Sequence, residues 1–177
     1  MQKRLMLQGT AAIVLFLGLV WSAAAGPQNL IPDPQFKNFD YDPLKHREVW
    51  KQRWIPYQIK APSEWKLDAG KQAVELKGGQ TFLHSPRFAV TAGKKLSVAV
   101  TAEGSGKVSV QFLWWKEDGG MTEPHRTIPV EPVEVKGASQ RITGTDTAPE
   151  GAAEAYIRIV VEEGTVTVSQ PEVTVAE

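Results

Sequence analysis

The chain has 177 residues, with 20 basic side chains, 20 acidic side chains and no cysteine. This even balance, without a basic stripe, argues against nucleic acid or an anionic membrane surface as the main partner. The lack of cysteine excludes disulfides, thiolate metal sites and cysteine nucleophiles, so a hydrophobic core must hold the fold.

The first 25 residues have the pattern of an export signal. Lys3 and Arg4 precede an apolar run over residues 11–21, and Ala23 to Ala25 supply the small residues of a cleavage site. We therefore expect a signal peptide over residues 1–25, a secreted, periplasmic or cell-surface location, and no membrane contact after cleavage. The alternative is an uncleaved membrane anchor, because the apolar run approaches spanning length.

Two irregular stretches come next. Residues 29–36 read Asn-Leu-Ile-Pro-Asp-Pro-Gln-Phe, which predicts an edge strand or a kinked strand, because proline cannot donate to a β-ladder. Residues 37–62 mix aromatic and charged side chains and are predicted to form a long ordered loop, with one helical turn around residues 44–50. Loops of this length in compact domains usually have a function.

From Glu64 onward the sequence has the pattern of an all-β domain. Short runs rich in β-branched and aromatic residues are separated by turns that contain glycine, and such spacing is typical of a sandwich or jelly roll. The predicted strands are residues 64–67, 73–77, 81–83, 87–91, 96–102, 107–115, 130–135, 140–145, 155–162 and 165–175. We expect a single β-sandwich over residues 26–177.

Alternation along these strands predicts the core. Successive side chains of a strand point to opposite faces, so every second residue of a strand shares one face. The predicted core residues are Leu96, Val98, Val100, Val108, Val110, Phe112, Trp114, Ile157, Ile159, Val161, Val166, Val168, Val173 and Val175, together with Trp65. Each buried aliphatic side chain stabilises the fold by roughly 1.5–3 kcal/mol, so these rows offset much of the ordering entropy.

The opposite face of two strands carries the candidate site. Gln111 and Trp115 share the parity that faces away from the core, as do Tyr156 and Arg158. Flat aromatic rings bind the C–H side of a pyranose, and planar hydrogen-bonding groups bind its hydroxyls. If the two strands lie in one sheet, the four side chains form a sugar-binding patch. The alternatives are an ordinary solvent face, or a second buried face under the long loop.

Trp54 is a further candidate contact, because it falls in the predicted loop and an aromatic loop residue can flank a sugar cleft. The alternative is that it plugs one end of the sandwich.

Catalysis has little support in the sequence. Glycoside hydrolysis needs two carboxylates across a cleft, whereas the acidic residues here fall mostly in turns and at strand ends. The three histidines, His46, His84 and His125, do not have metal-ligand spacing, and His84 at a strand end is interpreted as structural. We therefore expect a protein that is not an enzyme.

The order of these signals resembles the carbohydrate-binding modules of the galactose-binding-like jelly-roll type. Residues 29–36 are similar to the opening strand of that family, and a tryptophan follows at Trp54 or Trp65. The remaining matches are Ser85-Pro86 at a strand end, the turn and strand of residues 93–101, and Ala-Pro-Glu-Gly at residues 148–151 before the strand over residues 155–161. The resemblance covers nearly the whole chain after the signal and implies a jelly-roll β-sandwich that binds carbohydrate.

The resemblance also bears on calcium. Family members usually carry Glu after the opening Phe and an acidic pair in the final strand, carboxylates that help to hold a structural calcium ion. This chain has Lys37 after Phe36, and Ser-Gln-Pro-Glu at residues 169–172. Calcium binding therefore stays open, and no cofactor is assigned.

The leading hypothesis is an exported, non-catalytic domain that binds a polysaccharide or glycan through Trp115, Gln111, Tyr156 and Arg158, with Trp54 as a further contact. The alternative is an extracellular or envelope structural domain whose partner is another protein.

Overall fold

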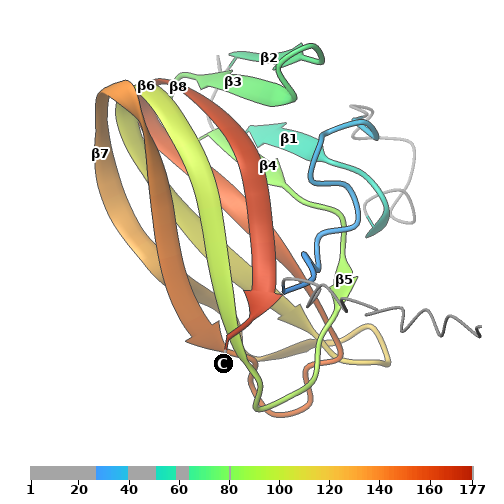
Figure 1. Cartoon of the computed structure of the whole chain (residues 1–177). Helices are drawn as coiled ribbons and strands as arrows, with labels where there is room; N and C mark the ends of the chain where they lie inside the picture. Colours follow the sequence, from blue (N-terminus) through green and yellow to red (C-terminus); the bar gives the residue numbers. More distant parts are fainter. Residues whose placement is uncertain (1–26, 40–50, 59–63, 80, 177) are drawn as a thin grey trace, which may run out of the picture.

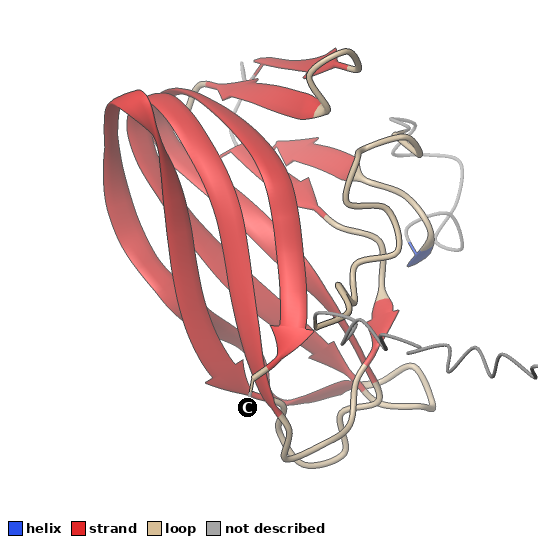
Figure 2. Cartoon of the chain, in the orientation of Figure 1, coloured by secondary structure: helices blue, strands red, loops and turns tan. Residues whose placement is uncertain are grey.

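The computed structural model describes residues 27–39, 51–58, 64–79 and 81–176. The expected signal peptide over residues 1–25 and the expected helical turn around residues 44–50 lie outside the described residues. Within these ranges every named element is a β-strand (Figure 2). The strands are β1 (Ile55–Gln58), β2 (Glu64–Asp68), β3 (Ala73–Lys77), β4 (Thr81–His84), β5 (Phe88–Ala89), β6 (Lys95–Trp115), β7 (Met121–Thr147) and β8 (Glu154–Val175). The all-β prediction is confirmed.

Three long strands build both layers of the sandwich. β6 pairs antiparallel with β7 on one side and with β8 on the other. Figure 1 shows the three strands turning over together at one end of the molecule, so that each contributes one half to each layer. β3 pairs with the second half of β8, and β4 pairs with its first half. We call the layer that contains β2 and β3 the β3 layer, and the layer that contains β1, β4 and β5 the β4 layer.

Glycines allow the strands to turn over without losing their pairing. Gly104 has φ 121° and Gly164 has φ 83°, and both lie in the middle parts of β6 and β8, where these two strands are paired. A Cβ atom at Gly104 would fall against the carbonyl oxygen of Thr165, and one at Gly164 against that of Ser105. The sequence predicted separate strands on either side of these glycines. The structure corrects this, because glycine both bends the strand and allows the close approach that keeps the ladder continuous.

The core lies between the two layers, as the alternation predicted. Val98 and Val100 from the first half of β6 and Val110 from its second half are fully buried. Phe112 and Trp114 pack against each other with ring centroids 4.7 Å apart, and the Trp114 indole N–H donates to Thr127 Oγ1 at 3.1 Å. Trp65 packs against the core while only partly buried. Val175 is the exception among the predicted core residues, because it is 49% exposed at the end of β8.

The opening segment differs from its prediction. Residues 29–36 form bends and turns rather than a strand. Leu30 N donates to Val173 O at 2.7 Å, and the Asn29 side chain accepts from Val173 N at 3.0 Å and donates to Pro171 O. The segment therefore lies along β8, but Pro32 and Pro34 have no N–H with which to extend the ladder.

Residues 121–129 were not predicted as a strand, yet they form the first part of β7. This part contains Pro124 and Pro129, which normally argue against a strand. The register against β6 is broken between Val110 and Phe112 and again between Leu113 and Trp115. Such bulges on an outer strand accommodate proline, because one side of the strand has no ladder to maintain. No helix in the described ranges is long and apolar enough to cross a membrane.

Candidate functional site

The four side chains predicted on two strands lie together on the outward face of the β4 layer. Gln111 is paired with Arg158, and the neighbouring pair on the same face is Leu113 with Tyr156. The Trp115 and Tyr156 ring centroids are 6.5 Å apart, with the ring planes at 27°. The condition set by the sequence, that the two strands lie in one sheet, is therefore met. We call this surface the aromatic–arginine face, defined as Phe82, His84, Arg87, Gln111, Trp115, Glu154, Tyr156 and Arg158.

Arg158 on β8 is held by side chains from the strands on either side of it, β4 and β6. Its Nε donates to His84 Nε2 at 2.8 Å, and its Nη1 donates to Gln111 Oε1 at 3.5 Å. The guanidinium carbon lies 4.8 Å from the centroid of the Phe82 ring. β4, β8 and β6 are neighbours in the sheet, and His84, Arg158 and Gln111 occupy one row across them. The orientation of the guanidinium is thus set by the strand register.

His84 is a neutral acceptor in this row. Burial, and secondly the charge of Arg158, lower the pKa of His84 to about 3. Because Nε2 accepts the Arg158 hydrogen bond, the ring proton of the neutral imidazole lies on Nδ1. The sequence interpretation of His84 as structural is incomplete, since the ring also orients an arginine of the candidate site.

Tyr156 lies close enough to two guanidinium groups for their charges to act on its phenol. Burial raises the pKa of its phenol, whereas the charge of Arg158, a side-chain hydrogen bond with Arg158, and the charge of Arg87 act in the opposite direction. The ring centroid of Tyr156 lies 5.2 Å from that of His84. The phenol therefore stays protonated at neutral pH and presents a hydroxyl next to both arginines.

Trp115 is less accessible than the sequence predicted. The Arg87 guanidinium carbon lies 4.1 Å from the centroid of the Trp115 ring, and Arg87 Nη1 is 3.1 Å from Glu154 Oε2. The indole nitrogen of Trp115 is buried and has no hydrogen-bond acceptor among the described residues. A buried donor without an acceptor costs about 1–3 kcal/mol of stability.

Arg87 and Glu154 are the site residues that sequence reasoning missed. Glu154 has the same outward parity on its strand as Tyr156 and Arg158, so alternation alone could have found it. Arg87 is the first residue of the predicted strand over residues 87–91, whereas the structure places it just before β5. No sequence signal places Arg87, because its position over Trp115 depends on where the chain goes after β4.

The edge of this face is apolar and exposed. Met121, which is paired with Trp115 across β6 and β7, is 53% exposed, and Ile128 farther along β7 is 43% exposed. Towards the centre the face is more buried than predicted, since Gln111 is only 9% exposed and Ser109 only 3%. The exposed part of the face is therefore the end that contains Trp115, Arg87 and Tyr156.

The structure overturns the prediction that Trp54 is a ligand contact. Its side chain is fully buried. The indole N–H donates to Asp33 O at 2.6 Å, and the ring packs on Phe36 with centroids 4.6 Å apart. The residue precedes β1 and fills the end of the core, which is the structural alternative considered from the sequence.

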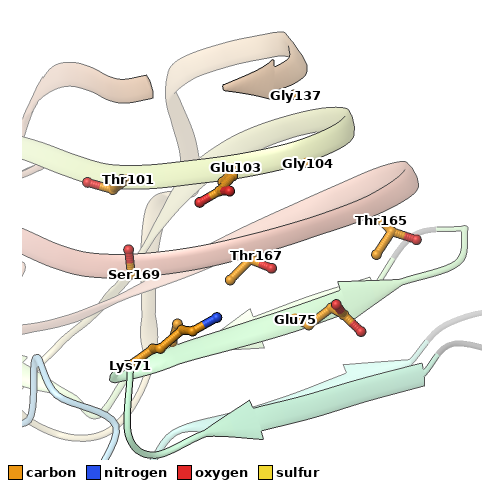
Figure 3. A pocket seen from close by; sticks show the side chains of 10 residues that line it. Lys71, Glu75, Thr101, Glu103, Gly104, Gly137, Thr165, Thr167 and Ser169 are labelled. Atoms are coloured by element: carbon orange, nitrogen blue, oxygen red, sulfur yellow. The ribbon is translucent and has the colours of Figure 1, made fainter. Parts of the chain in front are cut away.

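A hollow lies on the outward face of the β3 layer, and Figure 3 shows its lining. It has a volume of about 310 Å³ and is formed by β3, β8 and the first half of β6. Glu75 and Glu103 are paired with Thr167 from its two sides, so a hydroxyl stands between two carboxylates in one cross-strand row. We call this surface the hydroxyl groove. Its lining residues are Lys71, Ala73, Glu75, Thr101, Glu103, Gly104, Gly137, Thr165, Thr167 and Ser169, none of which is aromatic.

The residues present do not fit a calcium site of the kind that the resemblance implies. The Glu172 carboxylate in the last strand is 2.6 Å from Arg141 Nη2. The Asp33 carboxylate accepts backbone N–H groups of Lys37 and Asn38. No group of three or more His, Asp or Glu side chains able to hold a metal occurs within the described ranges. We therefore assign no role to a bound metal.

Comparison by sequence gives no relatives, since no family model and no curated protein matches the chain. Solved structures do match. The CBM22-1 xylan-binding domain of Xyn10C from Paenibacillus barcinonensis has a TM-score of 0.56 at 8% identity, covering 88% of this chain and 99% of that domain. The module TmCBM61, solved with β-1,4-galactotriose, has a TM-score of 0.50 at 13% identity, covering 84% and 99%.

An enzymatically active domain also contains a similar unit. Tailspike protein 4 of bacteriophage CBA120 matches with a TM-score of 0.54 at 11% identity, covering 84% of this chain. The chain spans only 21% of the length of that domain. At these identities the likeness concerns the fold. The chain has the jelly-roll β-sandwich fold of carbohydrate-binding modules.

Proposed function

We propose that this protein is an exported, non-catalytic domain that binds a polysaccharide or glycan through the aromatic–arginine face. One observation carries the proposal: Trp115 and Tyr156 lie side by side on adjacent strands with Arg158 and Gln111 in the next row. Aromatic rings next to planar hydrogen-bonding groups are the chemistry that sugar recognition needs. The fold supports the proposal, because xylan and galactotriose are bound by modules of similar structure.

Sugar binding at this face would use three kinds of contact. The partly exposed Trp115 and Tyr156 rings offer apolar surface to a pyranose. Arg158, held by His84 and Gln111, is oriented before the ligand arrives, so little side-chain entropy is lost on binding. The Tyr156 hydroxyl, which stays protonated at neutral pH, adds a hydrogen-bonding group beside the rings.

The test is a titration of the exported chain with soluble neutral and acidic polysaccharides, followed by tryptophan fluorescence. Tyr156→Ala is expected to weaken binding about tenfold, since stacked aromatic contacts contribute about 0.5–1.5 kcal/mol beyond area burial and 1.4 kcal/mol is a factor of ten. Thr167→Val in the hydroxyl groove is the matched control and is expected to bind as the parent does. Equal loss in the two variants, or no response to any polymer, contradicts the proposal.

A protein partner is the second candidate, and one observation favours it. Met121 and Ile128 are exposed apolar side chains at the edge of the same face, and exposed apolar groups are common where proteins associate. Replacing both with Ser separates the candidates. Glycan binding through Trp115 and Tyr156 would survive the double variant, whereas docking of a protein on this edge would not.

A further inference from the structure

The arginines of the aromatic–arginine face point to the chemical class of the ligand. Arg158 donates to His84, Arg87 lies over the Trp115 ring, and the charges of both act on the Tyr156 phenol. Arg126 on β7 is paired with Leu113, which is in turn paired with Tyr156, so a third guanidinium lies in the row of Tyr156. Guanidinium groups bind carboxylates in a planar, bidentate manner that neutral hydroxyls do not match.

The Arg87–Glu154 pair shows how a carboxylate is accommodated here. The guanidinium carbon of Arg87 lies over Trp115, 4.1 Å from the ring centroid. Arg87 Nη1 is 3.1 Å from Glu154 Oε2. The Arg87 side chain is 15% exposed and that of Glu154 is 41% exposed. The guanidinium is therefore fixed by the indole, while the carboxylate that it binds reaches solvent and can be exchanged.

On β8, two carboxylates share the outward parity of Tyr156 and Arg158. Along the same side of β8, Glu154 lies at the Trp115 end and Glu162 lies at the far end, beyond Val160. Of these two carboxylates, only Glu154 touches an arginine of the face. The chain as a whole is balanced in charge, so the concentration of arginine at this end of the β4 layer is a local feature.

Building on the proposed function, we propose that the ligand is an acidic glycan, one whose uronate carboxylates bind Arg87 and replace Glu154 above the Trp115 ring. Glu154 acts as an internal carboxylate that holds Arg87 in place until the ligand arrives. No covalent step is involved. Binding exchanges one carboxylate for another at a guanidinium that is already oriented, and the ring of the same sugar unit can then pack beside Tyr156.

The experiment compares acidic polymers with their own neutral forms. Polygalacturonate and alginate are each titrated into the exported chain beside the carboxyl-reduced polymer, by calorimetry at low and high NaCl. We expect each polymer that binds to bind at least tenfold more tightly in its acidic form, because hydrogen bonds between charged groups are roughly twice as strong as neutral ones. We also expect the affinity to fall with NaCl, since exposed charges are screened.

Two variants test the exchange at Arg87. Arg87→Gln is expected to weaken acidic-polymer binding about tenfold and to abolish the preference for the acidic over the carboxyl-reduced polymer. Glu154→Gln removes the competing carboxylate and is expected to tighten acidic-polymer binding several-fold. The matched control is Glu163→Gln on the same strand. The Glu163 carboxylate lies away from the site and binds Lys107 Nζ at a distance of 3.2 Å. This variant is expected to bind the polymers as the parent does.

The outcomes separate this inference from the proposed function. Equal binding of acidic and carboxyl-reduced polymers, or weaker acidic binding in Glu154→Gln, overturns the acidic-glycan inference while carbohydrate binding stands. Failure of every polymer, acidic or neutral, overturns both. Circular dichroism of the Arg87 and Glu154 variants shows whether a loss reflects the folded state rather than the site.

Discussion

The two outward faces of the sandwich are built by the same strands but differ in chemistry. The first half of β6 and the second half of β8 supply hydroxyls and carboxylates to the hydroxyl groove, whereas the other halves supply rings and arginines to the aromatic–arginine face. In the groove the lining residues other than Ala73 are exposed or half-buried, whereas on the other face Ser109 and Gln111 are buried. The comparison teaches that alternation identifies which side chains leave the core, but residue type and packing decide what each face can bind.

The core common to both faces gives the largest expected effect. Ile159 is fully buried between the layers. Ile159→Asp places a charge there without a partner, and we expect a loss of more than about 4 kcal/mol of stability, enough to unfold the domain. Circular dichroism measures this loss. A folded variant that keeps either face would show that the two layers do not depend on one core.

The stability of the protein is expected to fall in acid because of His84, which lies on the aromatic–arginine face. The unfolded chain binds a proton at His84 near pH 6.5, while the folded chain does so at about pH 3. Between these values the unfolded state holds more protons, so stability falls as the pH falls, by roughly 1.4 kcal/mol per pH unit. Stability from this source is fully present above pH 6.5.

Urea unfolding at several pH values checks this prediction. His84→Gln is expected to flatten the slope between pH 6.5 and pH 4, because the titrating group is gone. His125→Gln, at an exposed histidine on β7, is the control and is expected to keep the parent slope. Identical slopes in all three proteins would contradict the buried, neutral state of His84.

Substitutions at the glycines where the strands turn over are expected to reduce stability by less than a charge in the core does. Gly104 has φ 121°, and an added Cβ would meet the Thr165 carbonyl oxygen. Gly104→Ala is therefore expected to cost about 2–3 kcal/mol through strain and steric overlap. Gly93→Ala, which has a positive φ of 77° but open space around a Cβ, isolates the part due to φ alone. Thermal unfolding measures both, and equal losses would contradict the close approach of β6 and β8.

The smallest expected effect concerns a matched pair of arginines. Arg141 in the β3 layer bonds Thr101 Oγ1 at 3.2 Å and Glu172 at 2.6 Å on an exposed surface. Arg141→Gln is expected to cost about 1 kcal/mol or less, as for other exposed ion pairs, and to leave glycan binding unchanged. Arg158→Gln is expected to weaken glycan binding. Equal binding by the two variants would remove the distinction between the faces.

Much of the fold was predictable because alternation and glycine-containing turns are local signals. The core positions Val108, Val110, Phe112 and Trp114 follow from period two alone. The continuity of β6, β7 and β8 through their glycines was not predictable. A glycine between two runs reads as a turn, and only the neighbouring strand shows that the ladder continues through it.

Less of the candidate site was predictable. Trp115, Gln111, Tyr156 and Arg158 share parity on two strands, and pairing of those strands brought them together. Trp54 was predicted as a ligand contact but is buried, whereas Arg87 was not predicted as a site residue but lies in the site. Trp54 is a core residue preceding β1, and Arg87 covers Trp115. Both depend on contacts between segments far apart in sequence, which a local pattern does not encode.

The most direct test of the account is to map glycan binding by NMR on the isotope-labelled protein over residues 26–177. β6 and β8 each contribute to both faces, so the same two strands report on both. Binding at the aromatic–arginine face predicts amide shift changes in residues 109–115 and 154–160, and little change in residues 97–103 and 165–170. Changes confined to residues 97–103 and 165–170 would place the ligand in the hydroxyl groove and contradict the account.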